Sequence, residues 1–140
     1  MAKISADIEI DAPAGRVWGV ISDIDSEPRF WKGTKSIRNI SRDGNTTTRE
    51  ITIAFRDQKC MQTVILEPES KIVAKFTGGV IAGEKTIFLE PAGKATIMHV
   101  VWEIQMTGMM GMFTGIISRH IKKGTEQAIQ AIKKEIESNV

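Results

Sequence analysis

Residues 10–18 of this 140-residue chain read IDAPAGRVW, and within them the spacing of apolar residues changes. From Ile4 to Ile10 every second residue is apolar, which predicts a strand with one buried face. Pro13 suits the first turn of a helix, because the amide hydrogen that it lacks has no partner there. From Val17 to Ile24 the apolar residues recur at helical spacing. The sequence therefore predicts a strand followed directly by a helix.

Downstream of this helix the sequence predicts a meander of strands. Asp25-Ser26-Glu27-Pro28 ends the helix, and residues 29–31 indicate a second short helical turn. Because short loops join the strands that follow, neighbouring strands are expected to run antiparallel. Alternation and turn signals place six further strands near residues 35–41, 46–55, 58–67, 72–77, 84–90 and 95–107.

The last part of the chain predicts one long amphipathic helix. Between Gly108 and Val140 apolar residues recur every third or fourth position, with lysines and glutamates opposite. A bent antiparallel sheet must cover its apolar face, and this helix is the one predicted element long enough to do so. We therefore expect an α+β fold in which a curved seven-stranded antiparallel sheet wraps around the C-terminal helix, with two short helices after the first strand.

The composition is that of an ordinary globular protein, with 41% hydrophobic and 26% charged residues. One domain spanning residues 1–140 is expected, because a chain of this size folds without a metal or a disulfide. The lone Cys60 and the absence of a signal-like start favour the cytoplasm. A net charge of +2 is too small for nucleic-acid binding, and no apolar run is long enough for stable membrane insertion. The two histidines and one cysteine form no metal-ligand pattern, so neither a metal nor a cofactor is expected.

The order of elements and two local motifs resemble a known superfamily. The segment Ile10 to Trp18, followed by Ile21-Ser22-Asp23, is similar to the opening of START-like, or helix-grip, proteins: an apolar strand, Ala-Pro and a Val-Trp helix. Phe30-Trp31-Lys32-Gly33 resembles the aromatic and glycine turn that commonly follows. The likeness covers essentially the whole chain and is nearest to the polyketide cyclase/dehydrase-like branch.

This resemblance implies an elongated cavity between the sheet and the last helix. Members of the superfamily bind lipids, sterols, quinones, polyketides or plant hormones, and a minority catalyse cyclisation or dehydration. The fold therefore implies a pocket and not a particular reaction. The residues expected to contact a ligand are Trp31, Arg49, Ile53, Phe76, Trp102, Met106, Met110, Phe113, Ile117 and His120.

The methionines near the start of the last helix have two interpretations. Met106, Met109, Met110 and Met112 alternate with glycines of the segment Gly108–Gly115. Flexible thioethers suit an adaptable apolar pocket, and glycines would allow this segment to act as a lid. The alternative is that the methionines simply fill irregular space in the core.

Two polar residues are candidates for orienting a ligand. His120, at the edge of the helical apolar stripe, either contacts a polar head group or acts as a general base, and otherwise it is a histidine at the margin of the core. Arg49 shares its strand face with Ile51 and Ile53, so it is expected to point inward and either bind an anionic group or pair with a neighbouring acid. Gln62 is a weaker candidate for an inward polar contact.

Three functions remain open from the sequence. The first is binding or carriage of a small hydrophobic or amphipathic ligand, such as a lipid, a quinone or a polyketide-like molecule. The second is a cyclase or dehydratase with His120 as the base, although the chain has no tyrosine to supply a phenolic acid. The third is a protein-interaction module that uses the basic helix face near Lys122 and Lys123.

Overall fold

The structure is a computed structural model that describes residues 1–138. It contains seven strands, all in one antiparallel sheet with the order β1-β7-β6-β5-β4-β3-β2. The strands are β1 (Ala2–Ile10), β2 (Thr34–Asp43), β3 (Thr46–Ile53), β4 (Lys59–Glu67), β5 (Lys71–Gly79), β6 (Ile81–Ala92) and β7 (Ala95–Met106). The helices are α1 (Ala14–Ile21), α2 (Glu27–Phe30) and α3 (Thr114–Ser138), with 3₁₀ turns at η1 (Ile24–Ser26), η2 (Phe55–Asp57) and η3 (Gly108–Phe113).

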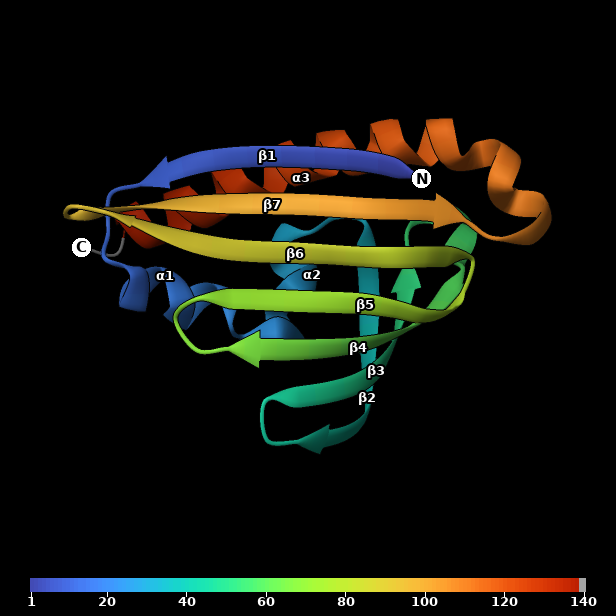
Figure 1. Ribbon diagram of the computed structural model, residues 1–140, viewed down its shortest axis with the longest axis horizontal. Coiled ribbons are helices and arrows are strands. Elements are labelled where there is room, and N and C mark those ends of the chain that lie inside the picture. Colours follow the sequence, from blue (N-terminus) through green and yellow to red (C-terminus); the bar gives the residue numbers. More distant parts are fainter. Residues whose placement is uncertain (139–140) are drawn as a thin grey trace.

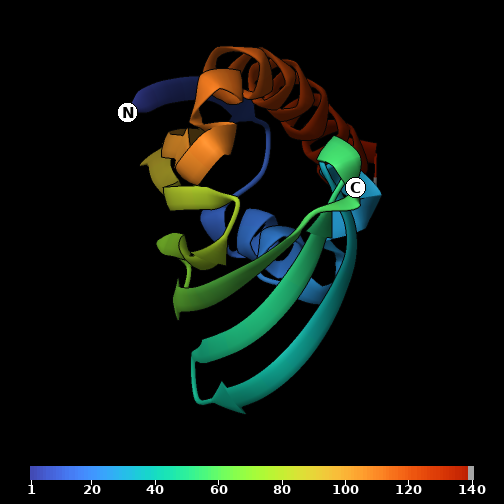
Figure 2. The ribbon, with the colours of Figure 1, turned by 90° about the vertical axis from the view of Figure 1, so that its right-hand side faces the viewer.

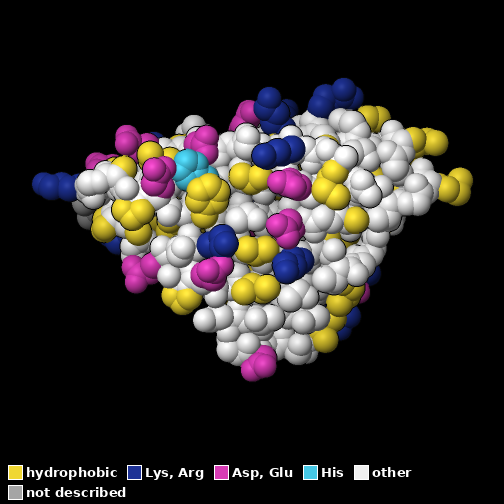
Figure 3. All heavy atoms as spheres, in the orientation of Figure 1, with side chains coloured by type: hydrophobic (Ala, Val, Ile, Leu, Met, Phe, Trp, Pro, Cys, Tyr) yellow, Lys and Arg dark blue, Asp and Glu magenta, His cyan; other side chains and the backbone are white. Residues whose placement is uncertain are grey.

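The predicted α+β architecture is confirmed. The sheet is strongly curved, and α3 lies along one side of it behind β1 and β7 (Figures 1 and 2). The short helices also contact α3, α1 beside β6 and β7 and α2 beside β2. Alternation along the strands sends one set of side chains to the concave face and the other to solvent, where charged and hydrophobic side chains are mixed (Figure 3). The last helix covers the concave face, as the sequence predicts.

Local details differ from the sequence prediction at three places. Pro13 occupies the N-cap position just before α1, one residue outside the helix. Glu27 and Pro28 begin α2 after the 3₁₀ turn, where the sequence predicts only a break. The glycines at 78, 79 and 83 fall between the strands predicted near residues 72–77 and 84–90. In the structure they lie inside β5 and β6, so those strands are longer than predicted, and Val80 alone separates them.

The core consists of two groups of buried residues at opposite ends of the sheet. One group surrounds α1 and the C-terminal half of α3 and includes Ile10, Val17, Met98 and Ile132. The other is smaller and lies near the start of α3. Trp102 packs against both groups. The region between them is where the sheet and α3 leave a cavity.

Candidate functional site

A cavity of about 350 Å³ lies between the concave face of the sheet and the first half of α3. Its wall is mainly apolar and comes from β3, β5, β6 and β7 on one side and from α3 on the other. Three exposed side chains of the lining, Lys32, Arg56 and His120, mark its opening to solvent. A volume of this size falls within the range of about 300–1,000 Å³ that is typical of small-molecule sites.

The aromatic part of the wall is centred on Trp102 of β7. The indole of Trp102 meets that of Trp31 edge-on at 6.3 Å between ring centroids and stacks on Phe76 at 6.4 Å. Its Nε1–H donates a hydrogen bond of 3.0 Å to Thr125 Oγ1 on α3. This bond ties the sheet to the helix beside the cavity and leaves the ring faces as a rigid apolar surface.

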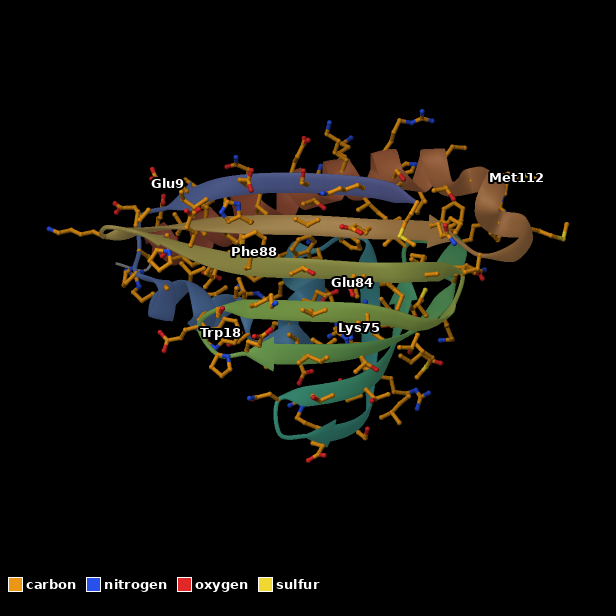
Figure 4. The ribbon with its side chains drawn as sticks, in the orientation of Figure 1. Glu9, Trp18, Lys75, Glu84, Phe88 and Met112 are labelled. Atoms are coloured by element: carbon orange, nitrogen blue, oxygen red, sulfur yellow. The ribbon has the colours of Figure 1, made fainter. Side chains whose placement is uncertain are left out.

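Lys85 of β6 is the most unusual residue of the cavity. Glu84 points out to solvent (Figure 4), so the next residue of the strand points to the concave face, where Lys85 is only 5% exposed. Its Nζ lies 3.1 Å from the ring centroid of Trp31 and 5.0 Å from that of Trp102. The ammonium donates no hydrogen bond to any residue among 1–138, although lysine carries three donors.

Burial of the ammonium lowers the pKa of Lys85 to about 8. Water solvates a charged amine far better than an apolar cavity does, so burial favours the neutral form. The nearby carboxylate of Glu27 opposes this effect, and the positive charge of Arg49 adds to it. Lys85 therefore still carries a proton at pH 7, but it holds it much less tightly than an exposed lysine does.

Glu27, which lines the cavity, forms a buried ion pair with Arg49, which lies behind the cavity wall. The Arg49 side chain is 1% exposed, and its Nη2 donates to Glu27 Oε1 at 2.7 Å. Its other donors reach Gln62 Oε1 at 2.9 Å and the carbonyl of Ile24 at 3.1 Å, while Thr34 Oγ1 donates to Glu27 Oε2 at 2.7 Å. Each nitrogen of the guanidinium thus donates a hydrogen bond to the protein. Arg49 pairs with a neighbouring acid, which is the second of the two roles that the sequence leaves open for it.

Burial acts against both charge and hydrogen bonding on the pKa of the Glu27 carboxyl. Burial by itself would raise its pKa, but the charges of Lys85 and Arg49 and the hydrogen bonds from Thr34 and Arg49 outweigh burial and hold the pKa below its usual value. Glu27 is therefore ionised at neutral pH. The cavity faces a fixed carboxylate whose partners are already in place.

Six of the ten expected ligand-contacting residues line the cavity. They are Trp31, Ile53, Phe76, Trp102, Ile117 and His120. His120 is exposed and lies on the rim, so it does not face the deep end of the cavity where Lys85 lies.

The other four residues lie outside the cavity wall. Arg49 is held behind it by the contacts described above. Met106 is buried in the smaller core group, and Met110 packs against that group. Phe113 contacts Phe55 at 6.3 Å between ring centroids. For Met110 and Phe113 the physical reason is the turn at Gly108, whose φ of 58° starts η3 and carries this segment beyond the end of the sheet.

Sequence reasoning missed the two most informative polar residues, Lys85 and Glu27. A signal for Lys85 was present, because it shares its strand face with Ile87 and Leu89, which are both buried. Glu27 gave no such signal, since it stands next to Pro28 in a segment that reads as a break. Among residues 1–138 no three His, Cys, Asp or Glu side chains are placed to hold a metal ion. Over the same residues, no helix is both long and apolar enough to cross a membrane.

Comparison with known proteins identifies a family and solved structures that share this fold. A family model described as polyketide cyclase/dehydrase and lipid transport matches residues 1–137. No curated protein sequence shows a significant match to this chain.

Solved structures share the fold at low sequence identity. A Thermus thermophilus protein is 15% identical, with 99% of each chain covered and a TM-score of 0.83. The Zhui aromatase/cyclase from a Streptomyces species is 10% identical, over 97% of this chain and 93% of that one, with a TM-score of 0.83. A START superfamily protein from Mycobacterium smegmatis is 15% identical, over 99% of each chain, with a TM-score of 0.77. At such identities the likeness shows the fold alone.

Proposed function

Because the chain belongs to the polyketide cyclase/dehydrase and lipid transport family, we propose that it binds and carries a small hydrophobic or amphipathic ligand in the cavity beneath α3. The observation that carries this proposal is the cavity of about 350 Å³ with a mainly apolar wall. Burial of a ligand against Trp31, Phe76 and Trp102 would contribute about 25 cal/mol for each Å² of apolar surface, before the costs of ordering are subtracted.

Gly124 offers a direct way to test whether the cavity is the binding site. It lies on the cavity face of α3, one turn after Ile121 and two turns after Ile117, and a Cβ built there meets no atom within 4 Å. A leucine at this position would extend from this open Cβ position and reduce the space for a ligand. Gly19 of α1 is a matched control, because it is also helical and open but lies outside the cavity.

We expect decanol to bind the wild-type protein and Gly19→Leu with the same affinity, and Gly124→Leu at least about tenfold more weakly, because the cavity is filled. Isothermal titration calorimetry measures the affinities, and circular dichroism checks that each variant is folded. Equal binding by folded Gly124→Leu would place the ligand elsewhere and contradict the proposal.

A second candidate function is cyclisation or dehydration of such a ligand. The observation that favours it is that two side chains of the acid–base type, His120 and Lys85, line the same cavity. Loss of water from a linear poly-β-ketone substrate, followed by mass spectrometry, tests this candidate. Turnover that stops in Lys85→Met or His120→Ala while the substrate still binds would favour an enzyme, and absence of turnover by the wild-type protein would favour the carrier.

A further inference from the structure

The deep end of the cavity holds hydrogen-bond donors that have no acceptor. The Nζ of Lys85 donates to no residue within 1–138, although the side chain is 95% buried. Gln62 is 2% exposed, and its Oε1 accepts from Arg49 Nε. Because arginine can only donate, this contact fixes the orientation of the amide, and the Nε2 group is left for another partner. Gln62 also lines the cavity, and within the described residues its Nε2 donates to nothing.

Glu27, the carboxylate whose charge acts on Lys85, accepts no hydrogen bond from it. Each carboxylate oxygen of Glu27 accepts a hydrogen bond, one from Arg49 and the other from Thr34. The buried charges are the two cations Lys85 and Arg49 and the single anion Glu27. One positive charge is therefore in excess beside an apolar cavity, and the contact of Lys85 Nζ with the Trp31 ring does not neutralise it.

We propose that the ligand is an amphipathic carboxylic acid whose carboxylate accepts hydrogen bonds from Lys85 and Gln62 while its apolar part lies along Trp31, Phe76 and Trp102. This inference rests on the proposed binding function and names the class of ligand. A carboxylate supplies both the negative charge and the hydrogen-bond acceptor that Lys85 and Gln62 lack, because it carries one negative charge and has room for several donors. An alcohol could accept hydrogen bonds but would leave the charge of Lys85 unpaired, and a cationic head group would be repelled by Lys85.

The closest test compares two probes that differ only in the head group, decanoate and decanol. At pH 7.5 we expect the wild-type protein to prefer decanoate over decanol by about tenfold or more, the range for a charge-assisted hydrogen bond. Lys85→Met should lose this preference and bind decanol at least as well as the wild type. The control Lys75→Met, on the outward face of β5 (Figure 4), should keep the preference. Calorimetry with circular dichroism on each variant gives these values.

A pH series on the wild-type protein tests the same inference without any variant. The charged groups that face Lys85 are Glu27 of α2 and Arg49 of β3, and Lys32, Arg56 and His120 line the rim of the cavity. Lys85 loses its proton as the pH rises through about 8. Affinity for decanoate should therefore fall between pH 7.5 and about 10, whereas affinity for decanol should not fall.

The outcomes separate this inference from the proposed function. Equal affinity of the wild-type protein for both probes, an unchanged preference in folded Lys85→Met, or no fall in decanoate binding at high pH would each overturn the carboxylate inference and leave cavity binding standing. Failure of both probes to bind would overturn the cavity proposal and the inference with it.

Discussion

Folding disfavours the charged form of Lys85, because its ammonium leaves water for a site that offers it the face of Trp31 but no hydrogen-bond acceptor among the described residues. Its pKa falls from 10.5 to about 8 on folding. Between these two values the unfolded chain binds more protons than the folded one, so the free energy of unfolding rises with pH. A residue that costs stability while facing a cavity is typical of a site selected for binding.

The lowered pKa of Lys85 predicts that the free energy of unfolding depends on pH, and Lys85→Met should remove this dependence. At pH 7 the variant should be more stable than the wild-type protein, since position 85 no longer places a charge in the cavity. The difference should shrink by about 3 kcal/mol between pH 8 and 10.5, as the wild-type lysine becomes neutral in both states. Urea unfolding at a series of pH values measures it. A difference that stays constant over this range would show that Lys85 is solvated in the folded protein.

At the scale of residues, the alternation of side chains between the two faces of a strand, called parity here, accounts for what the sequence could predict. Arg49 was expected to point inward because it shares a face with Ile51 and Ile53, and it is buried. The same reasoning applied to β6 would have found Lys85. Parity could not find the partner of Arg49, because Glu27 comes from α2 and meets β3 only through the tertiary fold.

Among the elements, β6 depends on the glycine at position 83. Gly83 has a φ of 116°, a region that side chains of L-amino acids rarely adopt. A Cβ at this position would lie 2.0 Å from the carbonyl oxygen of Glu103 and 2.9 Å from Ile104 Cα, both in the backbone of β7. The sequence prediction started this strand at Glu84 because glycine usually signals a loop, but here it allows close approach of two strands.

Gly83→Ala should therefore destabilise the protein by more than about 2 kcal/mol, because both the backbone angle and the neighbouring strand would have to change. Gly19→Ala is the matched control: this residue is exposed in the middle of α1, and alanine there should stabilise the protein by about 0.5–1 kcal/mol through helix propensity. Thermal and urea unfolding measure both. A Gly83→Ala protein as stable as the wild type would be inconsistent with the close strand contact.

The segment η3 shows why local composition predicted the wrong location for two methionines. Met109 is 90% exposed and Met112 is 78% exposed, and Met112 projects from the far end of the molecule (Figure 4). Flexible thioethers among glycines favoured either an adaptable pocket or the filling of core space, and both interpretations place these methionines inside. A 3₁₀ turn has a different period from an α-helix, and η3 ends before α3 begins at Thr114.

On the scale of the whole molecule, the cavity follows from the uneven packing of α3. Its C-terminal half buries Thr125, Ala128, Ile129, Ile132 and Ile136, whereas Ile117 is the only buried residue before Thr125. The curved sheet therefore stays in close contact with the second half of the helix and leaves space beneath the first. The sequence could predict the sheet, the helix and their order, because these follow from periodicity. It could not predict the volume of the cavity, which depends on side chains brought together from distant strands.

The central claim is that a ligand lies inside this cavity, between the sheet and α3. Isotope-filtered nuclear Overhauser spectroscopy tests it most directly, with labelled protein and unlabelled decanoate. The account predicts contacts from the ligand chain to Trp31, Phe76, Trp102 and Ile117. Contacts confined to the exposed methionines Met109 and Met112 would show that decanoate binds at the surface, and would contradict the account.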